Sequence, residues 1–483
     1  MLKIKLLATS AIFASLLATV AVDAQQHNRN ELPDIGAAGS SILSIDKERV
    51  VGNAMMRHLR ASQPMLQDPV MTEYINDLGN RLVRNANDVN YQFTFFLIDN
   101  DEINAFAFFG GHVGIHTGLI TTADTESELA SVLAHEISHV TQRHLARRIE
   151  AQSKTQPLTT AGMLGGILLA LVNPTVGMAT ISTSMAASQQ ASINYTRGNE
   201  KEADRVGMNL LVKSNFDPMG APSFFGKMAE RFRYKSKPPA MLLTHPLPES
   251  RISDARLRAQ NYPRIQLPPS LPFELTKARI RARYQKEGKA NVAHFKGVID
   301  KLQYALKPAA QYGLALSYFE VKQYDEAREI LEMLHEGDKK NLFYVDALTD
   351  VYIATDEHEK AIAMLSKLSK FMPHNQVVAL NYANALQEHK EYGKAAEVLQ
   401  DFLLINPGHF LAYDLLTTTY RKAGKKALMH SSKAEVLALL GAYPKAIDEL
   451  QSGYNFADDS LMQKRIKARI IQFEDEQNKL KRL

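Results

Sequence analysis

The second half of the chain repeats itself every 34 residues, and this periodicity limits what that half can fold into more than any other feature of the sequence. Small, apolar and ring-bearing residues recur in register at this interval: Ala327, Ala361 and Ala395; Leu331, Leu365 and Leu399; Tyr318, Tyr352 and Leu386; Pro373 and Pro407. Alanine lets two helices approach closely, and proline ends a helical unit. The period therefore predicts a series of stacked helix pairs.

This spacing is typical of tetratricopeptide repeats, in which an aromatic or apolar residue precedes the alanine and another apolar residue follows it by one helical turn. A degenerate copy comes after the regular ones, with Leu437, Ala446 and Leu450 in the same relation. We therefore predict an α-solenoid over residues 307–483, with a concave surface suited to binding other proteins. Residues 263–306 are predicted to connect it to the first half, through a proline-rich linker followed by a mixed basic helix.

The first half contains the pattern H-E-x-x-H, formed by His135, Glu136 and His139 in a segment with helical periodicity. Residues four positions apart lie on one face of a helix, so both imidazoles can reach one divalent metal ion. Glu136 can then lie beside a water molecule that the metal activates and take its proton. Thr125 and Glu128 fit a capping box at the start of this helix. The pattern is typical of a zinc peptidase.

A third protein ligand is expected, because catalytic zinc sites bind the ion through three side chains and leave a fourth position open. Glu200 and Asp204 lie four positions apart in a second segment with helical periodicity. One carboxylate can bind the metal while the other hydrogen-bonds a ligand histidine from behind. Glu202 is expected to point elsewhere on this helix. If this segment stood alone, the simpler interpretation of Glu200, Glu202 and Asp204 would be a charged, solvent-exposed helix face.

Strands are predicted ahead of the H-E-x-x-H helix. Residues 91–98 alternate and are β-rich, and residues 104–109 lead through Gly110 and Gly111 into residues 112–118. The glycines suit a bend or a close approach of another backbone. A strand beside a protease site can pair with the main chain of an extended substrate, or it can be an ordinary edge strand. The sequence leaves these two alternatives open.

Three further histidines flank the motif. We expect His112 and His116 to be edge-strand side chains rather than metal ligands, because two better-spaced histidines follow them. His144 is off the ligand spacing, so we expect it at the surface or behind a ligand.

Taken together, the segments His135–His139 and Glu200–Asp204 resemble the zinc peptidase family that includes the CAAX prenyl proteases and the HtpX membrane protease, in which H-E-x-x-H is followed by E-x-x-A-D. The resemblance extends to residues 104–106 with Gly110 and Gly111, where that family places its substrate-pairing strand. It implies that His135, His139 and Glu200 bind one Zn²⁺ per chain. It also implies that Glu136 is the catalytic base and that Asp204 supports a ligand from behind.

His245 precedes a proline in the segment Thr244–Arg251, which also resembles a family element. An imidazole near the metal has two possible uses. It could steady the oxyanion of the tetrahedral intermediate, or it could occupy the open fourth position as an additional ligand and hold the enzyme latent. A purely structural turn histidine is the third alternative.

The N-terminus predicts the compartment. Lys3 and Lys5 precede an uncharged apolar run over residues 6–22, and small residues follow up to Ala24. We therefore predict a signal peptide over residues 1–24, cleaved after Ala24, rather than a membrane anchor. A flexible lead over residues 25–43 and a peptidase domain over residues 44–262 follow. In a Gram-negative cell the mature protein would lie in the periplasm.

Composition narrows the partners and ligands. The chain has no cysteine, which excludes disulfides, thiolate ligands and lipid attachment at an N-terminal cysteine. The net charge of +5 is small, and basic and acidic residues are interspersed, so no nucleic-acid-binding stripe is present. The apolar stretch at residues 161–172 is too short to span a bilayer. We expect a core helix there, with a mobile lid or peripheral membrane contact as alternatives.

These features predict a mostly α (α+β) fold, with a helical zinc-peptidase domain that carries a small β-sheet and an α-solenoid after it. Members of the family that combine both parts behind a signal peptide act on outer-membrane β-barrel proteins. The resemblance implies a periplasmic endopeptidase that degrades unfolded or stalled barrels, assists their maturation and contacts the barrel assembly machinery through its repeats. The main alternative is a chaperone or assembly scaffold with a latent or structural zinc site. A peptidoglycan-directed metalloenzyme shares the compartment but leaves the repeats unexplained.

Overall fold

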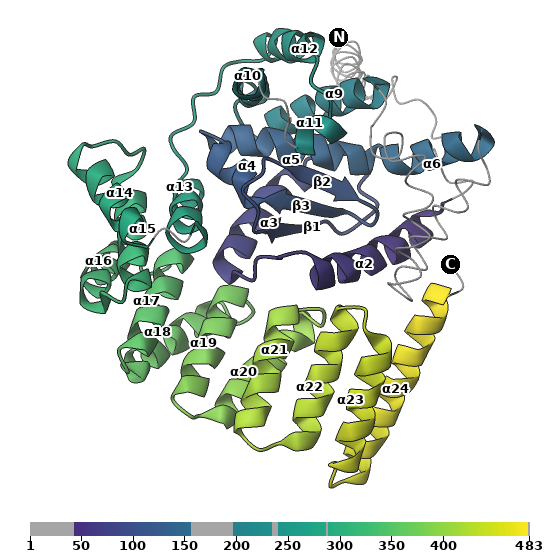
Figure 1. Ribbon diagram of the computed structural model, residues 1–483, viewed down its shortest axis with the longest axis vertical. Coiled ribbons are helices and arrows are strands. Elements are labelled where there is room, and N and C mark those ends of the chain that lie inside the picture. Colours follow the sequence, from purple (N-terminus) through teal and green to yellow (C-terminus); the bar gives the residue numbers. More distant parts are fainter. Residues whose placement is uncertain (1–42, 156–196, 234–239, 286–287, 482–483) are drawn as a thin grey trace, which may run out of the picture.

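A computed structural model describes residues 43–155, 197–233, 240–285 and 288–481. The predicted signal peptide and the apolar stretch at residues 161–172 lie outside these ranges. The fold class predicted from the sequence is confirmed, since the chain is mostly helical and has one small sheet (Figure 1). In the part of the chain that the structure describes, no helix combines the length and the apolar character that a membrane crossing requires.

The first half surrounds a three-stranded sheet with helices. Its elements, in chain order, are α2 Ile45–Ser62, α3 Pro69–Val83, β1 Thr94–Ile98, β2 Ala105–Phe108, β3 His112–His116, α4 Thr117–Thr122, α5 Glu126–Thr141, α6 His144–Thr155, α9 Arg197–Lys213, α10 Gly220–Phe232, α11 Ala240–Thr244 and α12 Glu249–Gln260. Helix α5 contacts α3, β2, α9 and α10, so it lies at the centre of this half (Figure 1).

The strand order corrects one prediction. The order is β1-β3-β2, with β1 parallel and β2 antiparallel to β3. His112 and His116 therefore lie on the central strand and not at an edge, and both are buried. Strand β2 is the edge strand beside α5. Gly110 and Gly111, at φ +80° and +82°, form the tight β2–β3 turn and adopt a backbone conformation that favours glycine.

Local signals explain where α5 begins. The Thr125 hydroxyl accepts the backbone N–H of Glu128 at 3.2 Å, which is the first half of the predicted capping box. The Glu128 carboxylate instead accepts the N–H of Asp124 at 2.7 Å. Almost every α5 side chain is buried, which fixes how the helix is rotated.

The second half is a series of antiparallel helix pairs that runs from left to right in Figure 1. Helix α13 Leu271–Arg279, the π-helical turn η1 Ile280–Tyr284 and α14 Lys289–Asp300 lead into it. The array comprises α15 Lys307–Glu320, α16 Tyr324–Gly337, α17 Leu342–Ala354, α18 His358–Phe371, α19 Gln376–Glu388, α20 Tyr392–Ile405, α21 Phe410–Lys422, α22 Lys426–Leu439, α23 Tyr443–Asn455 and α24 Ser460–Lys481. The repeated alanines Ala327, Ala361 and Ala395 are completely buried, as their spacing predicts.

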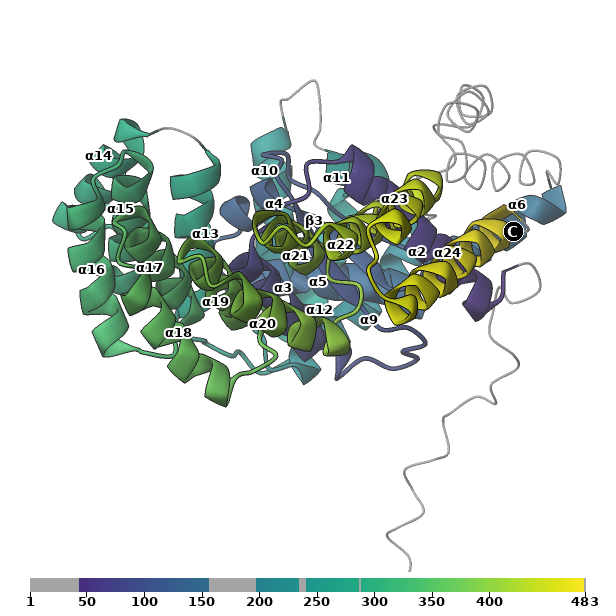
Figure 2. The ribbon, with the colours of Figure 1, turned by 90° about the horizontal axis from the view of Figure 1, so that it is seen from below.

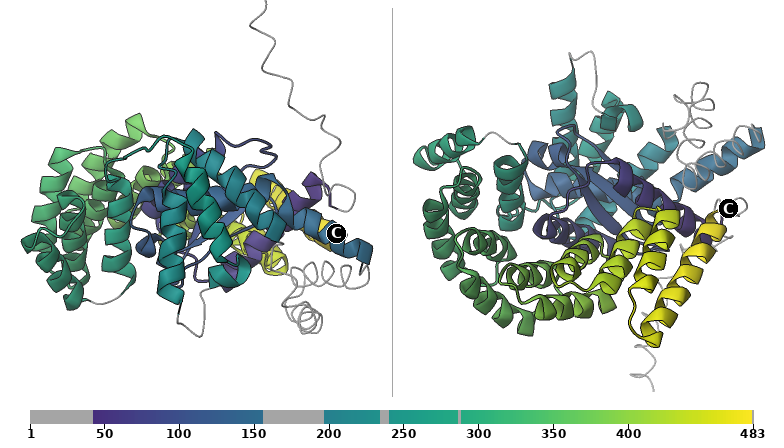
Figure 3. Two further views of the ribbon diagram at one scale, coloured as in Figure 1. Left: turned by 90° about the horizontal axis from the view of Figure 1, so that it is seen from above. Right: turned by 60° about the horizontal axis from the view of Figure 1, so that its bottom comes forward.

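The array curves around the first half, so that α2 and α3 lie along its inner side (Figure 2; Figure 3, right). The Glu73 carboxylate of α3 accepts hydrogen bonds from Asn375 and Gln376, both at 2.7 Å. At the other end, Arg60 of α2 donates to the carbonyl oxygen of Leu439 at 3.0 Å. Part of the concave surface predicted from the repeats is therefore occupied by the chain's own first half.

A buried ionic cluster joins the two halves where α13 meets the array. The Arg279 guanidinium donates to Asp68 at 2.6 Å, pairs with Asp346 at 2.7 Å and donates to the Tyr312 hydroxyl at 2.8 Å. Asp68 also caps the N-terminus of α3 through the N–H groups of Val70 and Met71. Since Arg279, Asp68 and Asp346 are all buried, this cation balances charges from both halves.

Candidate metal centre

Helix α5 supplies three side chains of the predicted site. His135, Glu136 and His139 are 5%, 0% and 3% exposed. The helical spacing places both imidazoles on one face, and their Nε2 atoms are 2.9 Å apart. The apolar residues of α5, such as Leu133 and Ile137, are completely buried and hold this face in one orientation.

Helix α9 brings Glu200 and Asp204 against that face. Glu200 Oε1 lies 3.5 Å from His139 Nε2, and Glu200 Oε2 lies 3.5 Å from His135 Nε2. Asp204 Oδ1 lies 3.1 Å from His135 Nδ1, on the far side of the ring. The close approach of the two helices depends on Gly207, where an added Cβ would stand 3.2 Å from the backbone of His135.

His245 enters the same cluster from the turn between α11 and α12. Its Nδ1 lies 3.0 Å from Glu200 Oε1 and 3.4 Å from His135 Nε2, and its Nε2 lies 3.5 Å from Glu136 Oε1. The residue is 4% exposed. The turn is anchored because the backbone N–H of His245 donates to the carbonyl oxygen of Met241 at 2.8 Å.

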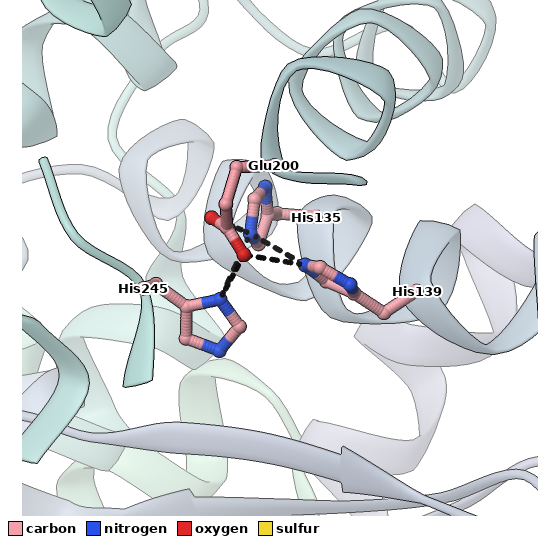
Figure 4. Close-up of side chains that lie close together, drawn as sticks. All are labelled: His135, His139, Glu200 and His245. Carbon is pink, nitrogen blue, oxygen red and sulfur yellow. Dashed lines mark hydrogen bonds and ion pairs between the residues drawn. The ribbon is translucent and has the colours of Figure 1, made fainter. Parts of the chain in front are cut away.

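Four ligand atoms, from His135, His139, Glu200 and His245, thus converge within 4.8 Å of one another (Figure 4). The distances given above between atoms of these four side chains run from 2.9 to 3.5 Å. Donors placed at about 2.0–2.1 Å around one tetrahedral zinc ion stand about 3.3–3.4 Å apart. The residues present therefore fit a four-coordinate metal ion of this size.

The pKa shifts of the two buried glutamates, Glu200 and Glu136, agree with a site for a cation. Burial alone would raise the pKa of Glu200, but hydrogen bonds from His135 and His245 outweigh it and hold the pKa well below its usual range. Burial raises the pKa of Glu136, although His245 and His135 oppose that shift. Neither carboxyl oxygen of Glu136 is held by a short hydrogen bond from another side chain among the described residues, and His245 Nε2 lies 3.5 Å away. A buried carboxyl group that no short side-chain hydrogen bond holds is suited to receive a proton from a substrate or a water molecule.

Arg251 holds the acidic residues and the His245 turn together, and sequence reasoning assigned it no role. Its guanidinium donates to Asp204 through Nε and Nη2, both at 2.8 Å, and pairs with Glu200 at 2.7 Å. It also donates to the carbonyl oxygen of Pro246 at 2.7 Å. The signal available in the sequence was its place in the segment that carries His245.

His144 is completely buried, so a surface position is excluded. Its Nδ1 lies 2.9 Å from His139 Nδ1, and its Nε2 lies 3.0 Å from Glu202 Oε2. Glu202 points away from the four ligand atoms, as expected, but toward His144 rather than into solvent. His112 contacts Asn53 at 3.0 Å and, like His116, does not join the cluster.

Comparison with known proteins identifies the relatives of this chain. Residues 69–259 match the model of Peptidase family M48. The "Putative beta-barrel assembly-enhancing protease" of Vibrio cholerae serotype O1 is 44% identical, over 92% of this chain and 93% of its own. The "Beta-barrel assembly-enhancing protease" of Escherichia coli K12 is 41% identical, over 93% of this chain and 92% of its own. That of Yersinia pestis is 40% identical, over 91% of each chain.

Among solved structures, a tetratricopeptide repeat protein from Parabacteroides merdae covers 50% of this chain and 96% of its own, at 12% identity and a TM-score of 0.29. That likeness is too low to carry an argument, and the repeat assignment depends on the helices themselves. The family model and the full-length relatives agree with the cluster on α5 and α9, and M48 enzymes are metallopeptidases. This chain belongs to peptidase family M48 and, within it, to the beta-barrel assembly-enhancing proteases.

Proposed function

We propose that the protein is a periplasmic zinc endopeptidase that degrades misassembled outer-membrane β-barrel proteins and assists their maturation. The observation that carries the proposal is the convergence of four ligand atoms beside the buried carboxyl group of Glu136. The printed names of the full-length relatives support barrel proteins as substrates. The N-terminal sequence supports export with cleavage after Ala24.

His135, His139 and Glu200 would hold the zinc ion. When bound, zinc supplies a Lewis acid that polarises the scissile carbonyl and eases deprotonation of a water molecule. Glu136 takes the proton of the attacking water and passes it to the leaving amine. Asp204 Oδ1 lies 3.1 Å from His135 Nδ1, where its negative charge orients the ring with Nε2 facing the ion.

Strand β2 is the proposed docking edge for the substrate. Within the described residues, β2 pairs with β3 on one side only, and Phe106 and Ala107 are partly exposed. Ala107 lies near enough for its main chain to influence the Glu136 carboxyl. An extended peptide added to this edge would bring its own main chain beside the catalytic base. Unfolded barrel strands are extended segments of this kind.

His245 is proposed to act as a latch. Its Nδ1 stands among the ligand atoms, 3.0 Å from Glu200 and 3.4 Å from His135, where the position left open in catalytic sites would lie. Zinc held by all four side chains would have no place for water or substrate. The protein would then wait in a latent state until the turn that carries His245 moves.

Replacement of His245 by alanine tests both the function and the latch. We expect the rate of cleavage of an unfolded outer-membrane barrel to rise by about tenfold or more, because an enzyme whose open state is a minor species gains rate when the closed state is removed. Zinc content should stay at one ion per chain. His374→Ala, at an exposed histidine of the repeats, is the matched control and should leave the rate unchanged.

Other results would change the assignment. If the wild type cuts and His245→Ala does not, at equal zinc content, His245 acts on the oxyanion instead. If neither protein cuts although both hold zinc, the scaffold alternative replaces the peptidase. A role of the repeats in contacting the barrel assembly machinery belongs to the same proposal, and crosslinking of the full chain to that machinery in cells tests it.

A further inference from the structure

A chain of hydrogen-bonded side chains leads from His139 away from the ligand cluster. His139 Nδ1 lies 2.9 Å from His144 Nδ1, and His144 Nε2 lies 3.0 Å from Glu202 Oε2. Arg147 donates to the same oxygen of Glu202 at 3.0 Å. His139 and His144 are both buried, whereas the Glu202 side chain is 28% exposed. The chain therefore connects the cluster to a carboxylate near the surface.

A strained turn places His144 behind His139. Helix α5 ends at Thr141 and α6 begins at His144, so only two residues separate the helices. Arg143 between them has φ +51°, a left-handed conformation that is unfavourable for arginine. Its guanidinium is fixed by Glu48 at 3.0 Å and by the carbonyl oxygen of Leu43 at 2.8 Å. A buried ion pair thus maintains the turn that brings the two imidazoles into contact.

The hydrogen bonds determine the tautomers of both rings. The Glu202 side chain is partly exposed and its Oε2 accepts a hydrogen bond from Arg147 at 3.0 Å, so the group is a carboxylate that can only accept. A neutral His144 then carries its proton on Nε2 and presents the lone pair of Nδ1 to His139. Because one proton must lie between the two Nδ1 atoms, His139 donates it. The lone pair of His139 is left on Nε2, the atom that faces Glu200 and His135.

We propose that His144 and Glu202 are positioning residues that select the metal-binding tautomer of His139. The inference rests on the proposed zinc site. Helix α9 would then orient both metal-binding histidines of α5, one directly and one through another side chain. Asp204 contacts His135 Nδ1 directly at 3.1 Å, whereas Glu202 reaches His139 Nδ1 through the ring of His144. A histidine five positions after the H-E-x-x-H motif thereby acquires a role that ligand spacing does not predict.

Zinc affinity is the direct readout, because loss of such supporting partners weakens metal binding by about 10–100-fold. We expect His144→Phe, which keeps a ring but removes the acceptor, to raise the zinc dissociation constant by that factor. His144→Asn retains an acceptor oxygen and should restore most of the affinity. Glu202→Leu, which removes the acceptor at a partly exposed side chain, should give a smaller loss in the same direction. The affinities are measured by competition with a chelating dye, in the full-length protein.

His374→Phe makes the same substitution at an exposed histidine of the repeats and should leave zinc affinity unchanged. Histidine ¹⁵N chemical shifts of the zinc-loaded protein give a second readout. The wild type should show His139 protonated at Nδ1, and His144→Phe should lose the hydrogen-bond shift of that proton. Circular dichroism verifies folding, and if His144→Phe does not fold, Glu202→Leu supplies the test.

Affinities of the His144 and Glu202 variants within twofold of wild type would overturn the proposal. Equal losses in His144→Phe and His144→Asn would also overturn it, since both would then reflect packing alone. The proposed function fails differently, because in that case the wild type itself does not bind zinc.

Discussion

Replacement of Glu136 by glutamine is expected to lower the rate of peptide-bond cleavage by about 10²–10⁴-fold, while zinc content stays at the wild-type value. The Glu136 side chain is completely buried, and among the described residues no short hydrogen bond from another side chain holds its carboxyl oxygens. Glutamine has the same size, so the packing of α5 should persist. Its amide cannot accept the proton of the attacking water, and the metal ligands remain in place.

The comparison is best made in the His245→Ala background, where the proposed latch is absent. Glu359→Gln changes an exposed glutamate of the repeat array and serves as the control for the loss of one charge. Cleavage of an unfolded barrel at the parent rate by the Glu136→Gln protein would assign the activity to another base or to a contaminating protease. A loss of both zinc and activity would show that the variant is misfolded at the site.

Replacement of Arg279 by methionine is expected to lower the free energy of unfolding by about 3–5 kcal/mol. Arg279 lies between Asp68 of the first half and Asp346 of the array, at 2.6 and 2.7 Å, and all three are buried. Methionine fills much of the same volume but leaves two carboxylates without their cation. Urea unfolding followed by circular dichroism measures the difference.

Arg49→Met is the matched control, because Arg49 pairs with Asp46 on the exposed face of α2, where the two side chains are 60% and 82% exposed. An exposed ion pair contributes about 0–1 kcal/mol. Equal effects of the two substitutions would mean that the buried cluster does not hold the halves together. A large loss at Arg279 with increased proteolysis between α12 and α13 would identify the cluster as their main attachment.

The repeat array and the helices were predictable because their signals are local. An alanine every 34 residues has only to face its neighbouring helix, and Ala327, Ala361 and Ala395 are all completely buried. The contacts of the array with α2 and α3 were not predictable. They join Arg60 to Leu439 and Glu73 to Asn375, residues hundreds of positions apart that have no shared periodicity.

The spacing of residues in the sequence predicted part of the candidate site. His135 and His139 share a helix face, and the structure brings Glu200 and His245 to them. The position of β3 within the sheet could not be predicted, because strand order depends on which distant strands pair. The contact between His144 and His139 could not be predicted either. It requires a left-handed backbone conformation at Arg143, and the ion-pair partner of Arg143, Glu48, lies on another helix.

The central claim is that the buried cluster holds one zinc ion. X-ray absorption at the zinc edge of the purified wild-type protein, with zinc content measured on the same sample, tests it most directly. The account predicts one zinc ion per chain, bound to four nitrogen and oxygen atoms at about 2.0–2.1 Å, with the scattering of three imidazole rings. A protein that remains without zinc after incubation in excess zinc, or an ion bound mainly by water oxygens, would contradict it.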